Sequence, residues 1–159
     1  MNKKNVKRDR MRFVKNKMSA NLAYLAIIFN VLYFVSIYSS DAGNYYYTML
    51  IGASVIYNLL FLLTAFLSSE GLKNYKMPYA IIITVIGALQ LVRILGFPLD
   101  ASSAEAAGET VMKAKQFTYT VTMLCLSSAS AIASGVIGMI RTITLEKHKK
   151  SIEKNNIVA

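Results

Sequence analysis

The chain has 159 residues, of which 55% are hydrophobic, and its 18 basic and 8 acidic residues give a formal net charge of +10. A chain of this length, with most of its residues in or beside apolar runs, has no room for a separate soluble domain. The positive charge could indicate nucleic-acid binding, but a basic cytoplasmic surface is also what membrane orientation requires, so we expect no nucleic-acid partner.

Residues 1–18 form a basic segment ahead of the first apolar run, and they hold eight of the basic residues. Val6, Met11, Phe13 and Val14 are interspersed among them. Such a segment could form a short helix at a lipid surface, where each basic residue near an anionic leaflet contributes about 1 kcal/mol. We predict contact with anionic lipid here, and docking of a cytoplasmic partner is the alternative.

Four apolar runs follow, and each is long enough to cross a bilayer as a helix. At a rise of 1.5 Å per residue, runs of about 19–24 residues span roughly 28–36 Å. They lack the continuous charged face of a soluble amphipathic helix. The predicted spans are 20–38, 49–67, 78–97 and 117–140. We therefore predict an all-α integral membrane protein with a four-helix bundle over residues 19–140.

The orientation follows from the basic residues, because positively charged loops resist translocation. Fifteen of the 18 lie in the N-terminal segment, in the short turn after the second run or in the tail 141–159, whereas the loop 39–48 has none. Both termini should then be cytoplasmic, which agrees with four spans. Tyr75, in that short turn, is expected to mark the inner interface.

The first run could be a cleaved signal peptide, but its length favours a retained span. The composition favours a plasma membrane, of the bacterial inner-membrane type.

Two asparagines lie near the middles of the first and second spans, Asn30 and Asn58. An antiparallel pair of helices joined by a short loop would place them at similar depth, so their amides could bond across the pair. Such bonds contribute about 1–2 kcal/mol between model membrane helices. We predict that they stabilise helix packing, with a substrate site as the alternative.

Arg93 carries the one charge inside a predicted span, and Gln90 lies one turn away on the same face. Because Arg93 is within about a turn of Phe97, its guanidinium should reach the outer headgroups. Asp41 or Asp100 could pair with it there. The alternative is a role in binding an anion or another subunit.

The fourth run is rich in small residues at helical spacing, which lets two helix backbones approach closely. Small residues recur at intervals of four in two rows: Ser127, Ala131 and Gly135, then Ser130, Ser134 and Gly138. This face must meet another helix. It could pack within the chain, for instance against Gly52 or against Gly87 and Ala88, or it could contact another subunit.

The sequence offers little for catalysis. Cys125 is the single cysteine, His148 is the single histidine, and the acidic residues lie outside the spans. No metal, cofactor or enzymatic activity is expected. We predict an accessory or assembly subunit of a larger membrane complex, such as an ABC-type transporter, that contacts other subunits through the fourth span. The alternative is a self-associating transporter or channel whose path is lined by Asn30, Asn58, Gln90, Arg93 and the serines of the fourth span.

Overall fold

The computed structural model describes residues 3–38, 49–103, 105–106, 109–110 and 112–158. Its four long helices are α2 (Lys17–Tyr38), α4 (Met49–Lys73), α5 (Met77–Ile94) and α7 (Ala114–Val158). Two shorter helices, α1 (Lys3–Arg10) and α6 (Phe97–Ser103), and an antiparallel pair of two-residue strands, β1 (Glu105–Ala106) and β2 (Glu109–Thr110), complete the described part. Apart from that pair, the regular structure is helical.

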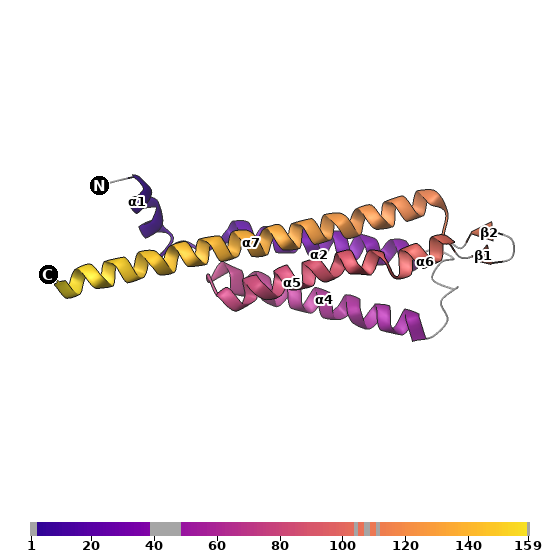
Figure 1. Cartoon of the computed structure of the whole chain (residues 1–159), viewed down its shortest axis with the longest axis horizontal. Coiled ribbons are helices and arrows are strands. Elements are labelled where there is room, and N and C mark those ends of the chain that lie inside the picture. Colours follow the sequence, from indigo (N-terminus) through magenta and orange to yellow (C-terminus); the bar gives the residue numbers. More distant parts are fainter. Residues whose placement is uncertain (1–2, 39–48, 104, 107–108, 111, 159) are drawn as a thin grey trace.

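The four long helices are long and apolar enough to cross a membrane, as the sequence predicted. They run side by side, with α2 and α5 each packed against both α4 and α7 (Figure 1). The packing leaves large apolar side chains uncovered, and on α4 Ile56, Leu59 and Leu63 are each more than half exposed. An extended apolar surface of this kind is suited to hydrocarbon rather than to water.

Helix α7 extends well beyond the predicted fourth span. The prediction ended this span at residue 140 and treated residues 141–159 as a separate tail, whereas the helix runs without a break to Val158. The added part is rich in Lys and Glu, which are good helix formers, and two of its side chains, Thr142 and Leu145, are buried. The basic tail is therefore a rigid continuation of the span, and it lies at the same end of the molecule as α1 (Figure 1).

The third span is shorter than predicted. Helix α5 ends at Ile94 rather than at residue 97, and the chain enters α6 after Gly96. Helix α6, the β1–β2 pair and Met112 form a small cap at this end, and Met112 is 2% exposed because it packs in a cluster with Tyr33 and Leu124. Part of the segment between the third and fourth predicted spans is therefore ordered against the helices.

The turn between α4 and α5 is tight and has an unusual residue at its centre. The amide of Lys76 donates to the carbonyl of Gly71 and that of Tyr75 to the carbonyl of Leu72, both at 3.1 Å, which is the pattern of a Schellman motif. Tyr75 takes the left-handed conformation, with φ of 56°, at the position where glycine is usual. A bulky residue in this conformation is held by its surroundings, and the Tyr75 hydroxyl is hydrogen-bonded to the carbonyl of Val14.

Candidate functional site

The small residues of the fourth span are buried within the chain itself. Ser127 donates a hydrogen bond to the carbonyl of Ala26 at 2.9 Å, and Ser134 donates to that of Ser19 at 2.6 Å, so both tie α7 to α2. The six residues that the sequence placed on this face are all buried: Ser127, Ser130, Ala131, Ser134, Gly135 and Gly138. A contact between α7 and another subunit would therefore have to use a different side of the helix.

The same helix approaches α5 so closely that side chains would not fit between the two. A Cβ atom added to Gly135 would lie 2.6 Å from the carbonyl oxygen of Ala80 and would also overlap the Thr84 hydroxyl. A Cβ added to Gly87 would lie 2.9 Å from that of Ala131. Gly87 thus belongs to the intrachain contact that the sequence suggested. Gly52 does not, since no described atom beyond its own stretch of helix lies within 4 Å of an added Cβ, and Ala88 is exposed.

A chain of side-chain hydrogen bonds joins three of the long helices inside the apolar region. Gln90 Nε2 on α5 donates to Asn30 Oδ1 on α2 at 2.8 Å, and Asn30 Nδ2 donates to Asn58 Oδ1 on α4 at 3.3 Å. The predicted bond between the two asparagines is therefore present. Asn30, Asn58 and Gln90 are 0%, 1% and 0% exposed, so these amides are sealed among the helices.

Arg93 extends this network from α5 to α4. Its Nη1 donates to Asn58 Oδ1 at 2.7 Å and its Nη2 donates to Ser54 Oγ at 2.9 Å. The guanidinium carbon also lies 4.4 Å from the ring centre of Tyr33 and 4.9 Å from that of Tyr57, which is cation–π distance. The sequence predicted that this side chain would reach the outer headgroups, whereas these contacts hold it between α2 and α4. Asp41 and the side chain of Asp100, its predicted partners, lie outside what the structure describes.

Arg93 points toward α4 rather than toward the headgroups because α4 offers neutral oxygen atoms that accept its hydrogen bonds. An arginine near the end of a span can reach the headgroups, but it can also satisfy its donors with amide and hydroxyl oxygens if these lie at the right depth. Asn58 and Ser54 lie one turn apart on α4 and present two oxygens to the two terminal nitrogens of Arg93. The sequence showed the amides but not that Arg93 would face them.

A second cluster lies where α1 and the residues after it fold back on the long helices. We call this the basic end, and it contains Arg10, Lys15, Lys73, Lys76 and Arg141. The amide of Asn16 donates to the carbonyl of Lys73 at 3.0 Å, and Arg141 Nη1 donates to Asn16 Oδ1 at 2.6 Å. The segment before α2 is therefore bound to both α4 and α7.

Tyr75 completes this attachment. Its hydroxyl donates to the carbonyl of Val14 at 3.1 Å, so the left-handed turn places the ring against the N-terminal segment. Burial raises the pKa of the Tyr75 hydroxyl above its usual value, and the nearby positive charge of Arg141 opposes part of this rise. The sequence identified Tyr75 only as an interface anchor; a non-glycine residue at a helix C-terminus gives no signal of a left-handed turn.

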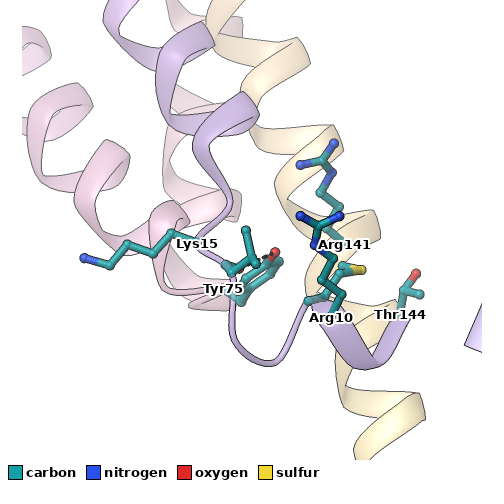
Figure 2. A pocket seen from close by; sticks show the side chains of 7 residues that line it. Arg10, Lys15, Tyr75, Arg141 and Thr144 are labelled. Atoms are coloured by element: carbon teal, nitrogen blue, oxygen red, sulfur yellow. Dashed lines mark hydrogen bonds between the residues drawn. The ribbon is translucent and has the colours of Figure 1, made fainter. Parts of the chain in front are cut away.

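A cavity of about 410 Å³ opens beside Tyr75 (Figure 2). It lies between the residues that follow α1 and the part of α7 beyond the predicted span. Its lining residues are Arg10, Met11, Val14, Lys15, Tyr75, Arg141 and Thr144. Two further cavities adjoin the same segment, and Arg8, Lys147 and His148 are among the residues that line one of them. The N-terminal segment and the extension of α7 therefore form one basic, recessed surface.

Comparisons with protein-family models, with curated proteins and with solved structures found no match to this chain.

Proposed function

We propose that this chain is a non-catalytic accessory or assembly subunit of a larger membrane complex, such as an ABC-type transporter. In this proposal the long helices form a four-helix transmembrane bundle in a plasma membrane, of the bacterial inner-membrane type, with both termini cytoplasmic. The orientation is supported by the basic end, because positively charged segments remain on the cytoplasmic side.

The observation that carries the proposal is the interhelical hydrogen-bond network that runs from Gln90 through Asn30 and Asn58 to Arg93. A solute path would need these polar groups on a water-accessible face, whereas the three amide side chains are 0–1% exposed. Groups sealed in this way stabilise helix packing, at about 0.6–2 kcal/mol for each interhelical bond. This arrangement favours a scaffold role over a conducting one.

The surfaces left for other subunits are the outer faces of the helices and the basic end. Since the small-residue face of α7 is used within the chain, the proposed contact moves to side chains such as Leu59 and Leu63 of α4, which are 60% and 56% exposed. The extension of α7 provides a second, cytoplasmic contact surface in the proposed orientation.

The alternative, a self-associating transporter or channel, is supported by one feature of the same network. Among the described residues, the Oε1 atom of Gln90 is buried without a hydrogen-bond partner. A buried acceptor of this kind costs about 1–3 kcal/mol, and a water molecule or a solute could satisfy it.

Purification of the tagged chain from its native membrane in mild detergent, with mass spectrometry and native sizing, tests the proposal. We expect one set of membrane subunits in fixed stoichiometry. A photo-crosslinking residue at Leu63 should label such a subunit, whereas the same residue at Phe61, which is on the same helix but 3% exposed, should not. A homo-oligomer without other subunits would refute the accessory role and favour flux assays on Asn58 and Arg93 variants.

A further inference from the structure

The cavity beside Tyr75 concentrates positive charge without a compensating acid. Arg10 and Arg141 both line it, and none of the described residues that line it is acidic. The nearest acidic side chain in sequence, Asp9, is used elsewhere: its Oδ1 lies 3.3 Å from Arg12 and 3.8 Å from His148. Two guanidinium groups in one recess repel each other, so the arrangement favours an anion between them.

The donors for such an anion are available. Within the described part of the chain, the guanidinium of Arg10 makes no hydrogen bond or ion pair, while Arg141 uses Nη1 for Asn16 and Nη2 for the sulfur of Met18. Figure 2 shows Lys15 lining the recess with its stem while its ammonium points away. Arg10 and the remaining N–H groups of Arg141 are therefore the groups that would bind the ligand.

Part of the lining of the same recess is apolar, and a site for a free inorganic ion would not need apolar side chains. Met11 and Val14 line it, and exposed apolar side chains lie on the same segment. Phe13 is 80% exposed, and Met18, which follows at the start of α2, is 51% exposed. Large apolar groups exposed beside basic ones are typical of a segment that contacts lipid.

The cavity also lies at the right level along the helices. Arg141 directly follows the last residue of the predicted fourth span, Tyr75 is in the turn between α4 and α5, and Lys15 comes two residues before α2 begins. The ends of several spans therefore surround it. Lipid headgroups occupy this level, and basic recesses between spans bind anionic headgroups.

We propose that this cavity binds the phosphate headgroup of an anionic phospholipid, with Arg10 and Arg141 contacting the phosphate and the acyl chains lying along Met18. The volume of about 410 Å³ is within the usual range for a small-ligand pocket. Because the lipid would join the segment after α1 to α7, its binding would hold the N-terminal segment in place. The inference depends on the membrane location of the chain but not on the accessory role.

The test is a calorimetric titration of the full chain in detergent with short-chain phosphatidylglycerol, short-chain phosphatidylcholine and inorganic phosphate. We expect phosphatidylglycerol to bind at least about tenfold more tightly than the other two, because Arg10 and Arg141 would repel the choline cation of phosphatidylcholine and because inorganic phosphate lacks acyl chains to contact Met18. Arg10→Gln should weaken phosphatidylglycerol binding by about tenfold. This variant should fold normally, because the Arg10 side chain makes no described contact that folding requires.

The matched control is Lys76→Gln, which removes one positive charge from the same end of the molecule but lies beside Tyr79 and lines none of the cavities described. Its affinity for phosphatidylglycerol should remain within about twofold of the unmodified chain. An equal loss in both variants would identify a diffuse basic surface and overturn the proposal. Equal binding of phosphatidylcholine, or of phosphate alone, would overturn it as well, because the phosphatidylcholine headgroup carries no net negative charge and inorganic phosphate is not a lipid.

Discussion

The close approach of α7 to α5 makes Gly135 the residue where one added methyl group should matter most. In Gly135→Ala the new Cβ would lie 2.6 Å from the carbonyl oxygen of Ala80 and would overlap the Thr84 hydroxyl. Thr84 could rotate, although its hydroxyl would then lose its bond to the Ala80 carbonyl at 2.8 Å. The Ala80 carbonyl belongs to the backbone of α5, so the two helices must move apart.

The size of the effect follows from two opposing terms. Overpacking of a close contact costs about 1–3 kcal/mol, while replacing glycine by alanine in a helix gains up to about 1 kcal/mol. The net loss for Gly135→Ala should lie between about 0 and 3 kcal/mol, with a middle value of about 1–2 kcal/mol. Gly52→Ala is the matched control, because it makes the same chemical change in a long helix with no described atom beyond its own stretch of helix within 4 Å of the added Cβ. Only the favourable helix term applies there.

Thermal denaturation of the detergent-purified chain, followed by fluorescence-detected size-exclusion chromatography of a fusion to a fluorescent protein, measures the difference. For a chain of this size, 1 kcal/mol corresponds to about 2–4 °C, so Gly135→Ala should lower the melting temperature by about 2–8 °C. Gly52→Ala should leave it unchanged or raise it slightly. Equal melting temperatures for the two variants would refute the close α5–α7 contact.

Further predictions concern the polar network and the basic end. Asn58→Leu removes the acceptor shared by Asn30 and Arg93 and should cost about 1–3 kcal/mol in the same melting assay. Thr64→Val, which loses only a bond within α4, should change stability by less than about 0.5 kcal/mol, and a similar loss in both would contradict the network. Arg93→Lys should also destabilise, because an ammonium cannot match the two-nitrogen contact with Ser54 and Asn58. Tyr75→Phe should speed tryptic cleavage of the N-terminal segment by releasing its bond to Val14; an unchanged rate would exclude this attachment. Because burial raises the pKa of Tyr75, its contribution to the free energy of unfolding should be complete below its ordinary pKa of 10.0 and lost as the pH rises through its pKa in the folded chain; melting temperatures of wild type and Tyr75→Phe on either side of this range would detect the loss.

The sequence alone was sufficient to predict four long helices and their approximate starts. Length, apolar character and the lack of internal charge are local properties, so they identify a membrane-spanning helix without knowledge of its neighbours. The ends were less predictable. The predicted fourth span stopped at residue 140, where the apolar run ends, but Lys and Glu continue a helix as well as apolar residues do, and α7 continues to Val158.

The sequence also identified which buried polar side chains would need partners, since an amide in an apolar span must be satisfied. It correctly paired Asn30 with Asn58, because a hairpin of two helices fixes their relative depth. The direction of Arg93 depended on the rotation of α5 about its own axis, which no local pattern specifies. In the structure, this rotation places Arg93 within hydrogen-bond distance of Asn58 and Ser54.

Tertiary structure alone decided how each surface is used. The small residues of α7 could have faced another subunit or the same chain, and the close contacts of Gly135 and Ser127 with α5 and α2 assign them to the chain itself. The recess formed by Arg10, Tyr75 and Arg141 joins residues 65 and 66 positions apart in the sequence, so no spacing rule could reveal it. Composition and periodicity determine what a segment can bury, whereas the relative placement of helices determines what it meets.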